Sequence, residues 1–128
     1  MRITEREQRG REVAGTAEAG VTVLSVSGEL SGEGVAPFRE QVMQRLDSPG
    51  QRDIVLDLTE LDGVDSGGLE ALLALQDAAA ERLAHVRLAG CPEALATVLR
   101  LTRLTDRFDM DRSVDEALAT LGALGANA

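Results

Sequence analysis

The sequence predicts an α/β fold, in which a mixed central β-sheet of about four to five strands packs against about four α-helices. Short β-branched runs alternate with amphipathic helical segments along most of the chain. Strand–helix–strand units require parallel pairs with right-handed crossovers. The first two runs are separated only by a short turn at Ala19-Gly20, which indicates an antiparallel pair. With 128 residues, the chain is long enough for one ordinary domain.

The strand predictions rest on β-branched and apolar runs between turn residues. Residues 21–27 are rich in valine, with apolar side chains at 21, 23, 24 and 26. Residues 53–58 form a short apolar run suited to a central strand covered on both faces. The predicted strands are residues 13–16, 21–27, 53–58, 86–89 and, as an edge strand, 108–110.

The helix predictions rest on apolar residues spaced three and four apart. The first helix ends at Ser48-Pro49-Gly50, the third begins near Pro92, and Ser113 caps the fourth with Glu116 at the capping-box position. The predicted buried positions are Val35, Phe38, Val42 and Leu46; then Leu69, Leu72, Leu73, Gln76, Ala79, Ala80 and Leu83; then Leu95, Val98 and Leu99; and finally Val114, Ala117, Leu118 and Leu121.

We predict a flexible polar N-terminus at residues 1–11, a single domain at 12–124 and a short tail at 125–128. The first dozen residues are charged and contain no signal peptide, and no run approaches the roughly 20 apolar residues of a membrane helix. Cys91 is the only cysteine, which suggests a reducing compartment. We therefore expect a cytoplasmic protein with no direct membrane insertion.

The charge balance excludes several function classes. The formal net charge is −9 and aromatic residues make up 2% of the chain, so nucleic acid is not an expected partner. All the basic residues are arginine. Mechanisms that need a lysine, such as those of P-loops, Schiff-base enzymes and receiver domains, are thereby excluded.

The segment from Leu61 to Gly68 follows the predicted central strand and precedes the second helix. Binding sites in such sheets lie beyond the carboxyl ends of strands. Asp65 or Ser66 can cap the helix, and the exposed amides with the helix dipole favour an anion there. The same residues are also ordinary helix caps, and residue types alone do not exclude that interpretation.

Catalytic interpretations of this loop meet specific objections. Chymotrypsin-like proteases place their histidine before the serine, whereas His85 follows Ser66. The nucleophile elbow needs glycine two residues before the serine, where Val64 stands. Asp57 and the following loop resemble a receiver phosphoacceptor strand, but the acidic pair and the lysine of that family are missing. We expect no enzyme activity, no metal and no cofactor.

From about residue 13 to 121, the chain resembles STAS domains, and in particular single-domain anti-sigma factor antagonists. The order and spacing of several segments carry this resemblance, including the match of residues 64–69 to the family's Asp-Ser-Ser/Thr-Gly-Leu loop. The matching segments are Gly28-Glu-Leu30, residues 38–42, residues 54–58, residues 64–69, residues 99–104, Phe108 and residues 114–118.

The resemblance implies a non-enzymatic switch. Antagonists of this family bind an anti-sigma factor of the histidine-kinase-like ATPase type and so free a sigma factor. That kinase phosphorylates the loop, which weakens binding, and a phosphatase reverses the change. The residues implied in partner binding are Ser31, Asp62, Asp65, Ser66, Gly67, Gly68 and Leu69.

This chain departs from the family pattern at three positions. Gly67 occupies the usual phosphoacceptor position, Ser31 replaces a frequent aspartate, and Arg103 stands where glycine is frequent. Either the protein is not phosphorylated and binds constitutively, or Ser66 is the acceptor. STAS domains also serve as subunits of lipid-transport ABC systems, in which a small residue can follow the loop serine, and Gly67 is compatible with that alternative.

Overall fold

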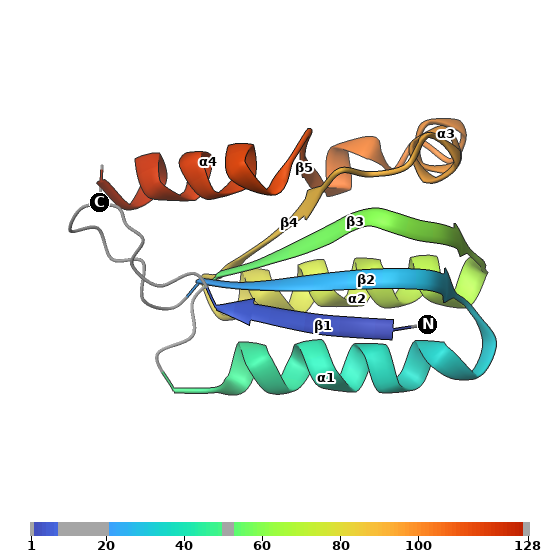
Figure 1. Cartoon of the computed structure of the whole chain (residues 1–128), viewed down its shortest axis with the longest axis horizontal. Helices are drawn as coiled ribbons and strands as arrows, with labels where there is room; N and C mark the ends of the chain where they lie inside the picture. The colour runs from blue at the N-terminus through green and yellow to red at the C-terminus, as the bar shows by residue number, and fades with distance from the viewer. Residues whose placement is uncertain (1, 8–20, 50–52, 127–128) are drawn as a thin grey trace.

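In the computed structural model, which describes residues 2–7, 21–49 and 53–126, a five-stranded sheet has the order β1-β2-β3-β4-β5 (Figure 1). β1 pairs antiparallel with β2, and the remaining neighbours pair in parallel. The strands are β1 (Arg2–Glu7), β2 (Val21–Leu30), β3 (Asp53–Val64), β4 (His85–Ala89) and β5 (Asp109–Asp111).

Among the described residues, three α-helices and two short 3₁₀ turns connect β2 to β5, and a fourth α-helix follows β5, so the predicted number of helices is confirmed. Helix α1 ends at Asp47, directly before the predicted Ser48-Pro49-Gly50 stop. The helices are α1 (Val35–Asp47), α2 (Ser66–Glu81), α3 (Glu93–Leu101) and α4 (Val114–Ala126), and the turns are η1 (Gly32–Gly34) and η2 (Thr105–Arg107).

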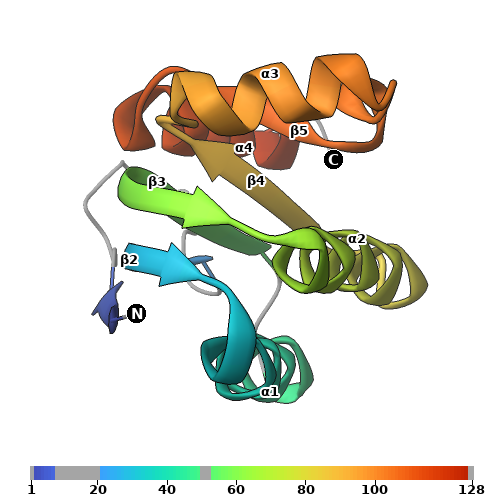
Figure 2. The same ribbon diagram turned by 90° about the vertical axis from the view of Figure 1, so that its right-hand side faces the viewer.

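The helices cover both faces of the sheet, with α1 and α2 on one face and α4 on the other (Figure 2). β3 shows why this is the stable arrangement, because Leu56 enters the larger core under α1 and α2 while Val55 enters the smaller core under α4. Both side chains are fully buried. The prediction of a central strand covered on both faces is therefore confirmed.

The opening strand differs from the prediction. Residues 13–16 lie outside the described residues, and residues 2–7, expected to be flexible, form the edge strand β1. Arg2 aligns with Ser27 and Glu7 with Thr22, so the pairing covers all of β1. An edge strand bonds to a neighbour on one side only, and its polar sequence is tolerated for that reason.

Helix α2 begins directly after Asp65 as predicted, but it ends at Glu81, before the predicted Leu83, and its buried stripe differs from the predicted one. Leu72 and Ala79 are buried as expected, whereas Ala80 is exposed and Leu83 lies beyond the helix with 87% of its surface exposed. Glu70, Asp77 and Glu81 recur at spacings of seven and four and are all exposed, so the helical period does mark the outward face, and the predicted stripe overlapped it. The other buried residues of α2 are Gly68, Ala71, Leu75 and Ala78.

The C-terminal third largely follows the predictions. Pro92 is the N-cap of α3 rather than part of its first turn, and Val98, predicted to be buried, is 41% exposed. The Ser113 hydroxyl accepts the amide of Glu116 at 3.1 Å, and the Glu116 carboxylate accepts the amide of Arg112 at 2.7 Å, which completes a variant of the capping box. Helix α4 extends to Ala126, two residues beyond the predicted domain end.

Candidate functional site

The candidate site lies where β2 and β3 end together. Both strands are longer than predicted, and Leu30 pairs with Val64 at their ends. The main-chain amide of Asp65 donates to the carbonyl oxygen of Leu30 at 3.3 Å. The chain then enters α1 and α2 at the same edge of the sheet, so the loops that begin these helices are neighbours (Figure 2). We call residues 30–34 and 64–69 the paired loops.

Asp65 fastens the paired loops to each other. One carboxylate oxygen accepts the amide of Gly68 at 2.8 Å, which caps α2, and the other accepts the amide of Gly32 at 3.1 Å. These amides, Gly68 first, hold the pKa of Asp65 below its ordinary value of 3.8. The predicted cap is thus Asp65 rather than Ser66, and it does more than cap a helix because it also fixes the loop before α1.

The two glycines after Ser66 have different surroundings. A Cβ atom on Gly68 would lie 2.3 Å from the carbonyl oxygen of Leu30, so only glycine fits there. A Cβ atom on Gly67 would lie 3.4 Å from a carboxylate oxygen of Asp65 and 3.9 Å from a methyl carbon of Val35. Position 67 therefore has room for a small side chain, although this chain has none.

The structure brings most of the predicted partner-binding residues together. Ser66 is the exposed first residue of α2, and Ser31 precedes the turn that contains Gly32. Leu69 is half-buried against the larger core, so only part of it faces outward. Asp62 was expected in a loop but lies on the last part of β3, where it is exposed.

Two residues of the site were not predicted. The carbonyl oxygen of Leu30 accepts the amide of Asp65, and it also lies so close to Gly68 that no side chain fits there. The amide of Gly32 is the second one that the Asp65 carboxylate accepts. Gly32 has a positive φ of 53°, a conformation that glycine adopts without strain. The glycine at position 32 was the available sequence signal, but the partner of its amide depends on strand pairing.

The serine and the histidine lie at opposite ends of the sheet. His85 begins β4 and aligns with Asp53, whose carboxylate lies 3.0 Å from the Nδ1 atom of His85. Ser66 follows the other end of β3, whose twelve residues span on the order of 35 Å at a normal strand rise. These positions do not form the Ser–His pair that a hydrolase would need.

Asp57 lies in the middle of β3 instead of at its end. Its carboxylate accepts the amide of Thr59 at 3.1 Å, the Thr59 hydroxyl, and the Ser25 hydroxyl at 3.5 Å. A receiver-type acceptor would be presented at the carboxyl end of its strand, so the geometry does not support that alternative.

Burial raises the pKa of the Cys91 thiol, which disfavours a reactive thiolate there.

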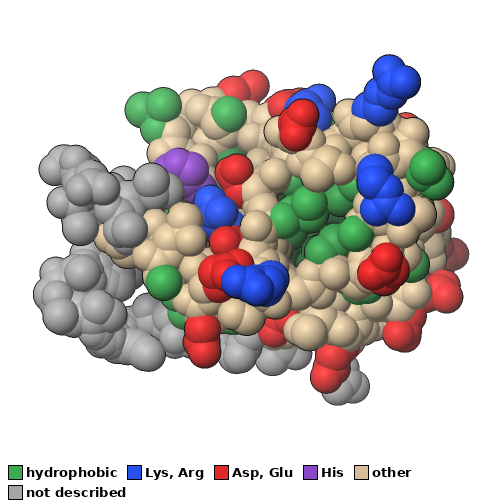
Figure 3. Space-filling model, turned by 90° about the horizontal axis from the view of Figure 1, so that it is seen from above, with side chains coloured by type: hydrophobic (Ala, Val, Ile, Leu, Met, Phe, Trp, Pro, Cys, Tyr) green, Lys and Arg blue, Asp and Glu red, His purple; other side chains and the backbone are tan. Residues whose placement is uncertain are grey.

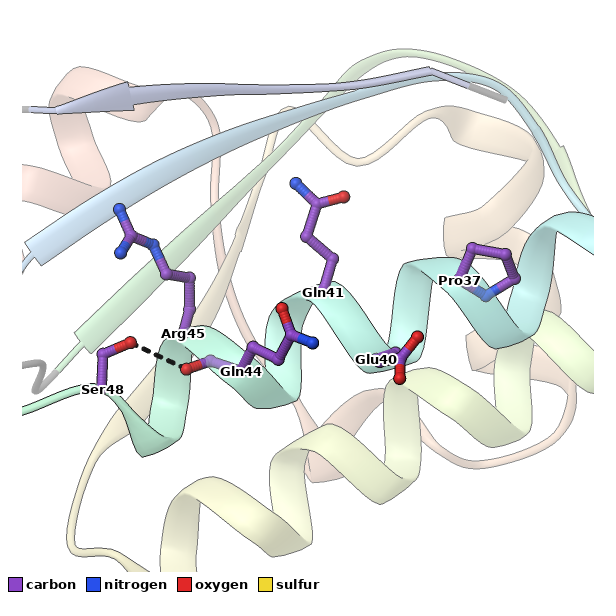
Figure 4. A pocket seen from close by; sticks show the side chains of 6 residues that line it. All are labelled: Pro37, Glu40, Gln41, Gln44, Arg45 and Ser48. Atoms are coloured by element: carbon purple, nitrogen blue, oxygen red, sulfur yellow. Dashed lines mark hydrogen bonds between the residues drawn. The ribbon is translucent and has the colours of Figure 1, made fainter.

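A groove of about 560 Å³ runs along α1 (Figure 4). Its lining side chains are mostly polar and come from α1 and from Ser48, the residue directly after it, so the groove does not include the paired loops. The Ser48 hydroxyl donates a hydrogen bond to the carbonyl oxygen of Gln44 at 2.9 Å. Ligand sites are usually enclosed and mostly apolar, so this polar groove is not a typical ligand site.

Among residues 2–7, 21–49 and 53–126, no group of three or more His, Cys, Asp or Glu side chains could hold a metal ion.

Among those same residues, no helix has the length and apolar character needed to span a membrane.

A family model described as "MlaB, STAS domain" matches residues 14–120. This match covers most of the chain and includes every element from β2 to the greater part of α4.

Solved structures with the same fold come from proteins of different kinds. An anti-sigma factor antagonist from Mycobacterium paratuberculosis is 25% identical, with a TM-score of 0.68 and 93% of each chain covered. The unphosphorylated anti-sigma factor antagonist SpoIIAA is 18% identical, with a TM-score of 0.72, covering 82% of this chain and 90% of that one. The mouse anion transporter Slc26a9 is 19% identical with a TM-score of 0.71; 82% of this chain matches only 18% of the transporter.

Proposed function

Because this chain belongs to the STAS domain family, we propose that it is an anti-sigma factor antagonist that docks on its partner through the paired loops and α2. The partner in this proposal is an anti-sigma factor of the histidine-kinase-like ATPase type, and docking releases a sigma factor. The protein acts by binding and catalyses no reaction. It works in the cytoplasm and needs no cofactor.

The fastening of the paired loops by Asp65 carries the proposal. Gly32 and Gly68 are both held by one carboxylate, so Ser66 is presented from a loop whose backbone is already ordered. A preordered surface loses less conformational entropy when a partner binds. Asp65 and Ser66 are both exposed at the start of α2, which suits a docking surface better than a catalytic pocket.

Regulation by phosphate depends on which residue can accept it. Gly67 has no hydroxyl, whereas Ser66 is exposed and next to it. A phosphate on Ser66 would add about −1.5 to −2 charges beside the Asp65 carboxylate, which already occupies the helix N-terminus. That repulsion favours the constitutive form of the proposal, in which the antagonist binds without a phosphate switch.

Direct binding tests the proposal. The purified full chain is titrated against each kinase-like anti-sigma factor encoded in the same genome, with and without ATP. We expect one of them to bind, and Ser66→Glu to weaken binding by introducing a charge at the docking surface. Gln44→Glu, on the exposed side of α1, adds the same charge and is the matched control, which should bind normally. The absence of binding to every such factor would contradict the proposal.

A second candidate is a STAS subunit of a lipid-transport ABC system. Gly67 favours it, because that role requires no acceptor hydroxyl, and the matching family model bears the description MlaB rather than that of an antagonist. Purification of the tagged chain from its native host distinguishes the candidates. Recovery of a permease and its ATPase, without a kinase-like protein, would replace the first proposal by this one.

A further inference from the structure

The paired loops stand at the tip of a two-stranded ribbon. Asp57 forms the last pair of β3 with β4, opposite Ala89, and Ser27 forms the last pair of β2 with β1, opposite Arg2. Beyond these pairs, among the described residues, β2 and β3 pair only with each other. Figure 1 shows both strands continuing past the end of β4. The register of this ribbon therefore decides which residues meet at its tip.

The ribbon begins with a bulge in β3. Ser25 of β2 pairs with Asp57, but Ser27 pairs with Glu60, so β3 has one extra residue between the two pairs. A second shift of the register follows directly after Gly28. The first of these irregularities lies where β4 ends and the ribbon leaves the full sheet.

The bulge keeps the apolar side of the ribbon on the core. Leu56, Leu58 and Leu61 all lie in the larger core, although Leu61 follows Leu58 by three residues instead of two. In a regular strand, alternate residues point to the same face, so Glu60 would be turned inward and Leu61 outward. Glu60 is exposed in the structure. The extra residue therefore avoids the burial of a carboxylate.

The bulge also decides which residues meet at the paired loops. Leu30 pairs with Val64, and its carbonyl oxygen accepts the amide of Asp65. If the bulge closed, the ribbon would shift by one residue, and Gly63 would lie opposite Leu30. The carboxylate of Asp65 would then move away from the amide of Gly32. The fastening of the paired loops thus depends on an irregularity that lies earlier in β3.

The carboxylate of Asp57 holds this bulge in place. One of its oxygens accepts the amide of Thr59 at 3.1 Å and also the Thr59 hydroxyl, which closes a local turn inside the strand. The Ser25 hydroxyl of β2 reaches the other oxygen at 3.5 Å. A methyl carbon of Thr59 lies 3.1 Å from where a Cβ atom of Gly90 would be, directly after β4. Asp57 therefore ties the extra residue of β3 to β2 and, through Thr59, to the end of β4.

Asp57 lies on the face of the sheet that carries α4. It alternates with Leu56 and shares its face with Val55, which packs under that helix. Figure 3 views this face, where charged side chains of both signs surround a hollow with hydrophobic side chains at its base. The helices leave part of the face open, and Asp57 is only half-buried. A carboxylate is tolerated at this position because it is hydrogen-bonded and partly solvated.

We propose that Asp57 is a positioning residue of the docking surface: by holding the bulge of β3, it sets the register that brings Asp65 to Gly32. The inference rests on the proposed function, since the paired loops are a docking surface only in that proposal. In this role Asp57 contacts no partner and accepts no phosphate. It acts through the backbone of the ribbon, which explains why a charged residue interrupts the apolar run of residues 54–58.

Hydrogen exchange in the purified full chain, without a partner, tests the role of Asp57 in the register. In Asp57→Ala, we expect the protection of the Asp65 amide to fall at least about tenfold more than that of the Ile54 amide, which lies where β3 has a strand on both sides. Leu121→Ala, in the smaller core, is the control. It should destabilise the whole fold without lowering the protection of Asp65 relative to Ile54. Equal effects on both amides in Asp57→Ala would overturn the proposal.

Two variants of Thr59 test the same bulge without changing Asp57. Thr59→Val keeps the shape and the methyl contact but removes the hydroxyl that Asp57 accepts. We expect it to lower the protection of the Asp65 amide relative to Ile54, whereas Thr59→Ser, which keeps the hydroxyl, should stay closer to the natural chain. These variants test the proposal even if Asp57→Ala does not fold. Natural protection of Asp65 in Thr59→Val would overturn the role of the carboxylate.

Binding to the kinase-like anti-sigma factor gives a second readout. Asp57→Ala should weaken binding at least about fivefold, because a disordered surface must be ordered on docking. Asp57→Asn, which keeps an acceptor oxygen for the Thr59 amide, should bind more tightly than Asp57→Ala, and Leu121→Ala should bind normally. Loosened loops with unchanged affinity would overturn the positioning role. A natural chain that binds no such factor would contradict the proposed function alone, and the exchange experiment would still decide whether Asp57 sets the register.

Discussion

The carbonyl oxygen of Leu30 lies where a side chain of Gly68 would begin, 2.3 Å from an added Cβ atom. The end of β2 and the first turn of α2 are therefore in direct backbone contact. This contact leaves room only for glycine, and it sets the position from which Ser66 and Asp65 are presented. The candidate site is thus built by the meeting of two segments more than 30 residues apart in the sequence.

Gly68→Ala should destabilise the fold by about 2 kcal/mol, because the new methyl group must displace the end of β2. Gly67→Ala is the matched control. Position 67 lies in the same helical turn, but an added Cβ atom there would have no neighbour closer than 3.4 Å. Because Ala has a higher helix propensity than Gly, this variant should leave the stability unchanged or raise it by about 0.5 kcal/mol. Urea unfolding of both variants measures the difference. Equal stability of the two variants would contradict the packing described here.

The fastening of the paired loops should weaken in acid. The pKa of Asp65 is lowered in the folded protein from its ordinary value of 3.8, so its stabilising contribution is present above that value and is lost as the pH falls through the lower, folded pKa. We expect the protection of the Gly32 and Gly68 amides against hydrogen exchange, corrected for the intrinsic rate at each pH and measured by NMR, to fall only below pH 3.8. Asp65→Asn should show fast exchange of the Gly32 amide already at neutral pH, since Asn has one acceptor oxygen in place of two.

Gly67→Ser should restore an acceptor at the usual position of the family. Its Cβ atom finds no contact shorter than 3.4 Å, so the variant should fold as the natural sequence does. If the partner is a kinase-like anti-sigma factor, incubation with that factor and ATP should add one phosphate to Gly67→Ser and should weaken its binding. Intact-mass measurement with Ser66→Ala in parallel assigns the phosphate. A phosphate on the natural sequence that disappears in Ser66→Ala would show that Ser66 is the acceptor instead.

The ion pair between Arg87 and Asp111 should be the most sensitive polar contact of the sheet. Their side chains are 13% and 5% exposed, and the guanidinium donates two hydrogen bonds, at 2.6 and 3.2 Å. Asp111→Ala should destabilise the protein by about 3 kcal/mol, because it leaves a buried arginine charge without its main partner.

The exposed pair of Arg112 and Glu116 is the control for that experiment. Its Arg112 side chain is almost fully exposed, so Arg112→Ala should change stability by no more than about 0.5 kcal/mol. Thermal unfolding at neutral pH compares the two substitutions. Similar effects of both would mean that burial does not govern the strength of the Arg87–Asp111 pair.

Local residue patterns predicted the order of the elements from β2 onward and several of their ends. Phe38, Val42 and Leu46 repeat at helical spacing and are all buried in α1, and Ser113 caps α4 as predicted. These features were readable because a helix period and a cap depend on residues at most four positions apart. The loop around Asp65 was found for the same reason.

The partners of that loop could not be predicted from nearby residues. The pairing of β1 with β2 and the extension of β3 to Val64 both depend on partners distant in the sequence. Asp65 reaches Gly32 and Gly68 faces Leu30 because parallel strands bring their carboxyl ends to one edge. Local residue types predicted a helix cap, and the close approach of two strand ends joined that cap to the loop before α1.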